Sequence, residues 1–531
     1  MSDSDRRTPS DFPAHNPQNS DQKTRDPKDP SKRQAIRYLI GGAVAAACPF
    51  PISALAAEAQ AMQRLGGEEN KLCHKVRDGG EFIFPKSSAE HEIVIIGGGP
   101  SGLIAAYRLR DSDFILLEKE PRLGGNAISE QWRGVWYSTG AAYQMDEGIE
   151  KLCREIGMPI NRIRSVDAAI INDQVVPEFW GDGLAKSPYP DSAKKNWAKF
   201  FADMKAIDFE KESDKLDNMV FADLLKPYGE ELRLFFDNFG PNNWGARTDS
   251  TSALIGAQSV TWGGGLDPNR FTWAGGLGRI SLALEEQLNK TAAAKFHKNA
   301  TVLNVERKGS KVQVSYSENG HLKTLTAKAA IIACPKFIAK RLIKNLDDDH
   351  YQAMNAMRYQ PYVVVNVCFN RVVYNGSYDT NIPFPSPIVD FNVADWVVNR
   401  DNKDINRPSV LTCYVPRPEA ERSRILDDQY VLGLGQQVVT HLDKWFPGSK
   451  AYVEEVHIYR RGHPMYVSAP GVLTKLAPKI RKPMGNIFFA HSDAEGGISE
   501  YSSALRAADR STQEAKTYLG QQAKRKMVSA S

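Results

Sequence analysis

The stretch HEIVIIGGGPSGLIAAYRLRDSDFILLEKEPRLGGNAIS, residues 91–129, decides the fold of this chain. It begins with the β-branched run IVII at 93–96, which is typical of a buried parallel strand. Three glycines in the spacing GxGxxG follow, directly before LIAAYRLR, whose apolar residues have helical spacing. The apolar run FILL, with a glutamate after it, predicts a second strand. This order of strand, glycine turn, helix and strand predicts a dinucleotide-binding βαβ unit.

Each part of this pattern has a mechanical reason. Gly97 permits a tight turn, Gly99 lets the backbone approach a pyrophosphate, and Gly102 lets the helix pack close to the strand. The helix N-terminus directs N–H groups and the positive end of its dipole at the phosphates. Glu118 can accept hydrogen bonds from both hydroxyls of a ribose, and its charge favours FAD or NAD(H) over NADP(H). The residues predicted to hold the nucleotide here are Gly97, Gly99, Pro100, Ser101, Gly102, Glu118 and Lys119.

Composition narrows the remaining classes of protein. The 531 residues exceed what one simple core usually holds, so two intertwined domains are expected. The net charge of +5 is modest and no basic block is dense, which disfavours a nucleic-acid surface. The six cysteines include no CxxC pair. Neither a metal site nor a disulfide-dense scaffold is therefore expected.

Two further segments carry a resemblance to a known family. Gly124 and Gly125 form a second glycine pair shortly after Glu118, and GNIFFAHSDAEGGISEYSS at 485–503 joins an apolar strand to a helix that begins at glycines. Both segments resemble the superfamily of flavin amine oxidases, phytoene desaturases and protoporphyrinogen oxidases. The chain departs from the family at Asn126, where an arginine is common, and at 500–501, where Glu-Tyr replaces the usual Gly-Ala.

The resemblance implies how FAD would be held. It puts Asp493 near the ribityl and phosphate groups and the strand at 300–302 against the adenine. The helix that begins after Gly496 and Gly497 would direct its dipole at the pyrimidine end of the flavin, where negative charge collects on reduction. The further cofactor residues implied in this way are Gly124, Gly125, Asn126, Val302, Asp493 and Ile498.

The resemblance also implies the architecture, an α/β fold. A Rossmann-like FAD-binding domain of the glutathione-reductase type would be interleaved with an α+β substrate domain. We expect the first from residues 88–160, 268–342 and 484–520, and the second from 161–267 and 343–483. The earlier insertion is helix-rich, and YVVVNVCFN at 362–370 in the later one predicts a strand.

Such a protein would transfer a hydride to flavin from a carbon that can stabilise the developing cation. Amine oxidases of the superfamily usually carry a lysine that holds a water near flavin N5, and our alignment puts Asn366 at that position. The chain lacks the C-terminal cysteine to which the family attaches flavin covalently, so non-covalent FAD is expected. The candidates for substrate contact or catalysis are Tyr466, His463, Tyr501 and Asn366. A histidine beside a proline is, however, more often a turn residue.

Two functions of different classes remain open. One is an exported FAD oxidoreductase that acts on an amine, or on an unsaturated substrate such as a porphyrinogen or polyene. The other is a non-catalytic flavoprotein in which FAD is structural. A small-molecule substrate is expected as partner and nucleic acid is not. A peripheral contact with a membrane or an electron acceptor stays open, as does the oligomeric state.

The N-terminal region has the build of an export signal. Residues 1–30 are polar and predict disorder. Lys32 and Arg33 precede a weakly apolar run at 38–47, and Ala-Leu-Ala at 54–56 suits signal peptidase. The basic stretch resembles a bacterial twin-arginine signal, with lysine for the first arginine, and implies a periplasmic location. A short helix or plain tail is the alternative. We expect 1–56 to be a disordered N-terminus with this signal, 57–87 a linker, and 521–531 a C-terminal tail.

Overall fold

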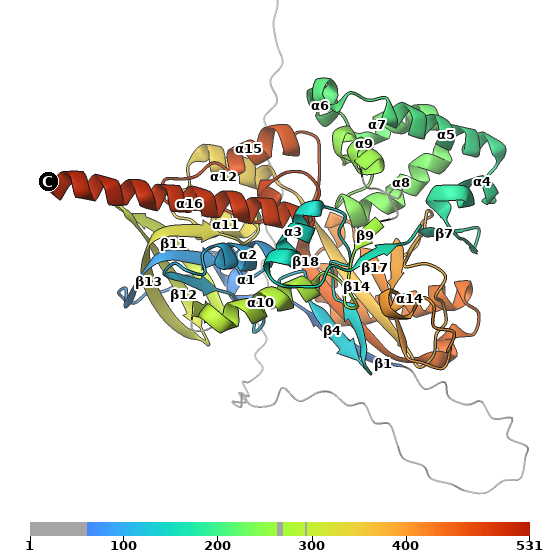
Figure 1. The fold of residues 1–531 in the computed structure, drawn as a ribbon, viewed down its shortest axis with the longest axis horizontal. Coiled ribbons are helices and arrows are strands. Elements are labelled where there is room, and N and C mark those ends of the chain that lie inside the picture. The colour runs from blue at the N-terminus through green and yellow to red at the C-terminus, as the bar shows by residue number, and fades with distance from the viewer. Residues whose placement is uncertain (1–60, 69, 263–268, 293–294, 531) are drawn as a thin grey trace, which may run out of the picture. The chain divides into compact units, whose positions relative to one another are not determined.

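The computed structural model describes residues 61–68, 70–262, 269–292 and 295–530. The first of the two large sheets within them has seven strands, in the order β10-β3-β2-β13-β12-β11, with β19 also paired with β13 (Figure 1). The predicted strands at 93–96 and 114–118 form as β2 and β3, which run parallel. The strands are β2 (Ala89–Ile96), β3 (Phe114–Leu117), β10 (Phe296–His297), β11 (Ala300–Lys308), β12 (Lys311–Glu318), β13 (His321–Ile332) and β19 (Ile487–Phe489).

Side chains along β2 point alternately to its two faces, and each face packs against a different layer of helices. Ile93 and Ile95 pack with side chains of α2, α10 and α16, whereas Val94 and Ile96 pack with side chains of α11 and α12. Both faces of the strand are therefore buried, which explains its uninterrupted apolar sequence. The helices are α2 (Pro100–Arg108), α3 (Glu147–Glu155), α10 (Gly278–Ala292), α11 (Lys336–Leu342), α12 (Asp348–Ala356), α15 (Ala477–Ile480) and α16 (Tyr501–Ala530).

The second sheet has eight strands in the order β1-β18-β14-β17-β16-β15-β7-β8. The predicted strand at 362–370 lies in its centre as β14, antiparallel to both β17 and β18. Odd-numbered residues of β14, such as Val363 and Val365, pack with α14 (Asp428–Trp445), and the even-numbered residues point to the other face. The strands are β1 (Met62–Gly67), β7 (Ala168–Ile171), β8 (Gln174–Val176), β14 (Tyr359–Phe369), β15 (Asp379–Asn381), β16 (Asp390–Val393), β17 (Ser409–Pro416) and β18 (Val453–Tyr466).

A layer of helices follows β8 in the chain and lies beyond one end of the second sheet (Figure 1). Its core is aromatic, with Trp197, Phe200, Phe235, Phe236 and Trp244 all buried together. The sequence predicted a helix-rich insertion here. The helices are α5 (Asp191–Lys205), α6 (Phe209–Asp217), α7 (Phe221–Leu225), α8 (Glu230–Asn243) and α9 (Ala253–Trp262). Two short sheets are formed by β4 (Ser129–Trp132) with β5 (Val135–Ser138) and by β6 (Arg162–Arg164) with β9 (Asn269–Phe271).

Two expected segments differ in the structure. The linker expected at 57–87 contains β1, which pairs in parallel with β18 at the edge of the second sheet, and the helix α1 (Lys71–Arg77). β1 forms through its long-range pairing with β18, and no local sequence pattern predicts this pairing. The tail expected at 521–531 continues α16 as far as Ala530, in a sequence of good helix formers. The predicted disorder and export signal at 1–56 lie outside the described residues. No described helix is both long enough and apolar enough to span a membrane.

Candidate functional site

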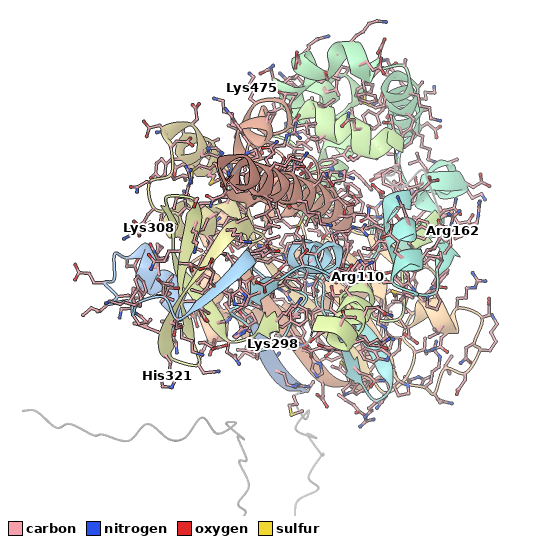
Figure 2. All side chains as sticks on the ribbon, turned by 60° about the vertical axis from the view of Figure 1, so that its left-hand side comes forward. Arg110, Arg162, Lys298, Lys308, His321 and Lys475 are labelled. Atoms are coloured by element: carbon pink, nitrogen blue, oxygen red, sulfur yellow. The ribbon has the colours of Figure 1, made fainter. Side chains whose placement is uncertain are left out.

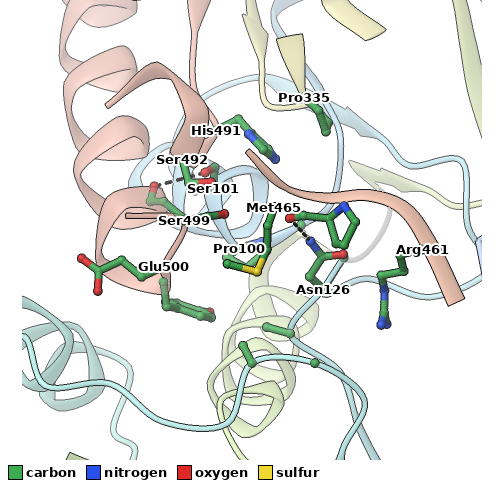
Figure 3. A pocket seen from close by; sticks show the side chains of 18 of the residues that line it. Pro100, Ser101, Asn126, Pro335, Arg461, Met465, His491, Ser492, Ser499 and Glu500 are labelled. Carbon is green, nitrogen blue, oxygen red and sulfur yellow. Dashed lines mark hydrogen bonds between the residues drawn. The ribbon is translucent and has the colours of Figure 1, made fainter. Parts of the chain in front are cut away.

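A continuous cavity of about 1020 Å³ lies between the two sheets. Its wall runs from the glycine loop before α2 to the face of the second sheet that α14 leaves uncovered, and Figure 3 shows its middle part. Of the predicted cofactor residues, the wall includes Gly97, Gly99, Pro100, Ser101, Glu118, Lys119, Gly125, Asn126, Val302 and Ile498. It does not include Gly102, Gly124 or Asp493.

Glycines bring two chain segments together at one end of this cavity. A Cβ on Gly102 would lie 1.8 Å from the carbonyl oxygen of Gly97, so no larger residue fits there. A Cβ on Gly125, whose φ is +55°, would lie 3.0 Å from Cα of Gly99. The N-cap of α2 is Gly99, and no side chain caps the helix. The first turn therefore keeps its N–H groups available to an anion in the cavity.

The carboxylate of Glu118 lies in the wall beside this loop. Its Oε2 accepts a hydrogen bond from the backbone N–H of Gly98 at 2.5 Å, and its Oε1 accepts one from that of Glu120 at 2.8 Å. Burial raises the pKa of Glu118, while the two backbone donors act to lower it. The donors fix the carboxylate at the end of β3, and its remaining lone pairs can accept from the hydroxyls of a ligand.

The same end of the cavity is closed by a segment that precedes the nucleotide fold. Glu68, Asn70 and Cys73, which follow β1, line the wall together with the strand at 300–302. Sequence reasoning predicted the strand and missed the three side chains. The residues around them carry no motif, and only the pairing of β1 with β18 puts them there.

Asn126 and Arg461 lie side by side in the wall (Figure 3). A Cβ on Gly140 would meet the carbonyl oxygen of Asn126 at 2.3 Å and Nη1 of Arg461 at 3.8 Å. Arg461 donates to the carbonyl oxygen of Thr139 at 2.6 Å and to its Oγ1 at 3.1 Å, and Asn126 donates to the carbonyl oxygen of Pro464 at 3.0 Å. Among the described residues no carboxylate lies within 4 Å of this guanidinium, which is only 6% exposed, and burial lowers its pKa. Sequence reasoning missed Arg461, a buried cation suited to an anionic ligand.

The opposite end of the cavity, which we call the distal chamber, is aromatic and polar. Its wall is formed by Tyr143, Asn242, Trp244, Tyr362, Asp379 and Tyr414. Tyr362 of β14 and Tyr414 of β17 place their rings 6.1 Å apart at an angle of 76°. The hydroxyl of Tyr362 donates to Oδ1 of Asn242 in α8, so the sheet and the helical layer meet at this wall.

Two of the predicted catalytic residues lie in the wall between these ends. The ring of His463 stacks on Phe337, with centroids 4.1 Å apart, and burial together with the charge of Arg422 lowers its pKa to about 3. His463 is therefore neutral at pH 7. The hydroxyl of Tyr501 lies 3.5 Å from Oγ of Ser281 in α10, and burial raises its pKa.

The other two predicted catalytic residues do not reach the cavity. Asn366 is fully buried farther along β14, where its Oδ1 accepts from Oγ1 of Thr412 at 2.7 Å. The residues of β14 that line the wall are Tyr362 and Val364, and neither carries an amine. Tyr466 is 1% exposed in the core behind the wall, and its neighbour Met465 faces the cavity instead.

The carboxylate of Asp493 is directed into the protein, whereas the resemblance implied a contact with the cofactor. Its Oδ1 lies 2.8 Å from Nζ of Lys336, and its Oδ2 accepts from the backbone N–H of Lys336 at 2.8 Å and from the hydroxyl of Tyr359 at 2.7 Å. The charges of His491 and Lys336 hold its pKa well below the usual range despite complete burial. His491 and Ser492, which precede it, line the wall. Asp493 therefore positions the loop that does so.

Comparison with known proteins decides the family. The sequence model of the flavin containing amine oxidoreductases matches residues 100–511, from the glycine loop into α16. The chain belongs to this family. It is a flavin-dependent oxidoreductase, as the sequence predicted.

Relatives of this flavin oxidoreductase are distant in sequence. Oxidoreductase PigB of Serratia sp. (strain ATCC 39006) is 22% identical over 79% of this chain and 74% of its own length. Flavin-containing amine oxidase B of Bos taurus is 23% identical over 80% of this chain and 86% of its own. The structure of cyclohexylamine oxidase from Brevibacterium oxydans IH-35A has a TM-score of 0.64, is 18% identical, and covers 81% of this chain and 99% of its own. This likeness confirms the predicted α/β fold.

The residues present in this flavin oxidoreductase fit the cofactor that its family implies. Gly102 and Gly125 allow backbone segments to approach so closely that a Cβ would clash, the N-terminus of α2 has no side-chain cap, and Glu118 offers acceptors for a ribose. Arg461 supplies a buried guanidinium without an acidic partner among the described residues, which an anionic cofactor would satisfy.

Proposed function

We propose that this protein binds FAD non-covalently and oxidises a small-molecule amine held in the distal chamber. The observation that carries the proposal is the continuous cavity that joins the glycine loop and Glu118 to that chamber. A cofactor bound at the loop and a substrate in the chamber would share one enclosed space. The amine oxidases among the similar proteins support an amine as the electron donor.

A bound flavin supplies a two-electron acceptor that takes hydride from the carbon next to the amine nitrogen. The chain's own residues must bind the amine, orient that carbon and exclude water. Tyr362 and Tyr414 offer aromatic rings to a protonated amine. His463 stays neutral because of its low pKa, so it adds no positive charge that would repel the substrate.

The cysteines of the cavity support non-covalent binding. Cys73 and Cys334 are the two described cysteines in the wall, and both lie at the end formed by the nucleotide fold. Burial raises the pKa of Cys334 to about 12 and also raises that of Cys73. Both thiols are therefore protonated at neutral pH and are weak nucleophiles.

We also infer that the protein works outside the cytoplasm. The basic residues Lys32 and Arg33, the apolar run after them and the small residues at 54–56 support export into the periplasm. A twin-arginine-like route suits this chain, because that route carries proteins already folded around a cofactor.

Anaerobic photometry tests the proposed reaction. Purified protein is mixed with a panel of primary amines, polyenes and porphyrinogens, and the oxidised flavin band is followed. Amines should bleach the band, and Tyr414→Ala should slow the bleaching without lowering the flavin content. Bleaching by a polyene or porphyrinogen alone would assign the enzyme to desaturation. A flavin that no compound reduces would favour a structural cofactor.

A further inference from the structure

Three carboxylates and one guanidinium are buried together beside the distal chamber. Asp167, Asp379 and Asp390 are 3%, 5% and 3% exposed, and Arg270 is 1% exposed. Arg270 pairs with Asp167, with 2.6 Å between Nη1 and Oδ1, and its guanidinium stacks on the ring of Tyr143 at 4.5 Å. Within the part of the chain that the structure describes, neither Asp379 nor Asp390 has a cationic side chain within 4 Å. Carboxyl groups therefore outnumber cationic side chains at this wall.

The register of the second sheet puts both of these acids on the chamber side. Asp390 of β16 is opposite Tyr414 of β17, which is opposite Val364 of β14. Residues opposite one another in a sheet point to the same face, and Tyr414 and Val364 line the cavity. Asp379 also lines it. Since Asn381 is directly opposite Asp390, Asp379 is its diagonal neighbour, at a Cα separation of roughly 7–8 Å.

One oxygen of Asp390 is held in place and the other is left without a donor. Nδ2 of Asn242 donates to Oδ2, and Asn242 is fixed in turn by the hydroxyl of Tyr362. Oδ1 of Asp390 has no hydrogen-bond partner among the described residues. A buried carboxylate oxygen without a donor is destabilising, and a ligand that brings one removes that penalty.

The pKa values of these acids follow from the same excess of carboxyl groups over cationic side chains. Burial and the charge of Asp167 raise the pKa of Asp379 to about 7, and burial with the charge of Asp379 raises the pKa of Asp390 well above its usual value. Arg270 lowers both but is already paired with Asp167. A ligand with positive charge would let the two carboxyl groups ionise and would gain charge-assisted hydrogen bonds from them.

We propose that Asp379 and Asp390 bind a second ammonium group of the substrate, so that the preferred donors are α,ω-diamines or longer polyamines. This inference rests on the proposed function and deepens it, because one amino group is oxidised while the other is held at the end of the chamber. The rings of Tyr362 and Tyr414 lie beside these acids and suit the methylene chain between the two groups. A monoamine of equal length would leave both carboxyl groups without a cation.

Binding is measured apart from oxidation. FAD-loaded protein is titrated anaerobically by calorimetry with 1,4-diaminobutane, 1,6-diaminohexane and spermidine, and with n-butylamine and n-hexylamine as matched monoamines. At least one of the diamines and spermidine should bind roughly 10- to 100-fold more tightly than the two monoamines. Asp379→Asn and Asp390→Asn should each reduce that preference. Asp182→Asn should keep it, because the side chain of Asp182 is 82% exposed and lies outside the cavity wall.

The outcomes separate this inference from the proposed function. Equal affinity for diamines and monoamines overturns the inference even when monoamines bleach the flavin. No binding of any diamine overturns it too, as does a diamine preference that survives both substitutions. Diamine binding without bleaching by any amine supports the site and contradicts amine oxidation. Asp379→Glu, which keeps the charge, should retain part of the preference, and thermal melting shows which variants are folded.

Discussion

The ammonium group of Lys336 lies 2.8 Å from the carboxylate of Asp493, and neither side chain has any exposed surface. Nζ of Lys336 also donates to the carbonyl oxygen of Ala490 at 2.7 Å. The pair thereby joins the start of α11 to the loop after β19, behind the cavity wall that His491 and Ser492 form. A buried ion pair of this kind contributes little net stability. Removing one partner is nevertheless strongly destabilising, because it leaves the other charge buried and unpaired.

Lys336→Met should destabilise the protein by about 3–5 kcal/mol, because it leaves the carboxylate of Asp493 buried without its cation. The double variant Lys336→Met with Asp493→Leu should recover part of that loss. Urea unfolding of the single and double variants checks the expectation. Equal stability of Lys336→Met and wild-type protein would show that Asp493 finds another partner.

Glu118→Ala should weaken retention of the cofactor, since the ribose hydroxyls lose a fixed charged acceptor. The expected change is about 1.5–3 kcal/mol in binding free energy, or roughly tenfold to a hundredfold in Kd. Glu120→Ala is the matched control, and its effect should be far smaller. Flavin content after gel filtration measures both variants, and equal loss from both would show that Glu118 is not the ribose acceptor.

Arg461→Met should separate folding from cofactor binding. Removing a buried guanidinium that has no described acidic partner should leave the stability of the flavin-free protein unchanged or raise it. The same change should reduce flavin affinity at least tenfold if this cation faces an anionic part of the cofactor. Thermal melting of the apoprotein and flavin titration give the two readings. Arg461→Lys should keep part of the affinity, and unaltered flavin affinity in Arg461→Met would remove Arg461 from the cofactor site.

Asp379 should make folding stability depend on pH. Its pKa is raised to about 7 in the folded protein, against about 3.9 when unfolded. Between these values the native state holds a proton that the unfolded state has released, so unfolding free energy falls as pH rises through this window. Asp379→Asn removes this contribution. The variant should therefore gain stability relative to wild-type protein, by about 1.5 kcal/mol at pH 5 and about 4 kcal/mol at pH 8. Urea unfolding at the two pH values tests this, with Asp182→Asn as a control that should show no such gain.

Export predicts a mature chain that begins near Ala57 and carries flavin outside the cytoplasm. Replacing Lys32 and Arg33 with glutamines should trap a longer, flavin-loaded precursor inside the cell, because the basic stretch precedes the apolar run of the signal. N-terminal sequencing and cell fractionation provide the readings. Native protein that begins at Ser2 and stays in the cytoplasm would contradict export.

The sequence predicted those parts of the fold whose causes are local. The glycine spacing at 97–102 and the apolar runs beside it require one geometry, which the structure has. β1 could not be predicted in the same way. Its residues, MQRLGG, have little strand character, and they form a strand because β18 offers a parallel edge.

In the site, the backbone segments predicted from the sequence lie in the cavity wall, whereas some of the side chains predicted there do not. Val302 and Ile498 lie in the wall as expected. Asn366 and Asp493 come from correctly predicted segments, yet their side chains lie outside the wall. Arg461 and the acids Asp379 and Asp390 were missed. Each of these residues is a candidate because no opposite charge lies close to it among the described residues. That environment is formed by strands far apart in the sequence, so no residue spacing predicts it.

The pairing of β1 with β18 also sets an order of events during synthesis. β1 leaves the ribosome before the nucleotide fold, and β18 is translated near the end of the chain. β1 has no partner strand until then, so a chain that stops before residue 453 leaves β1 unpaired near its N-terminus. Pairing of β1 with β18 therefore distinguishes finished from unfinished chains.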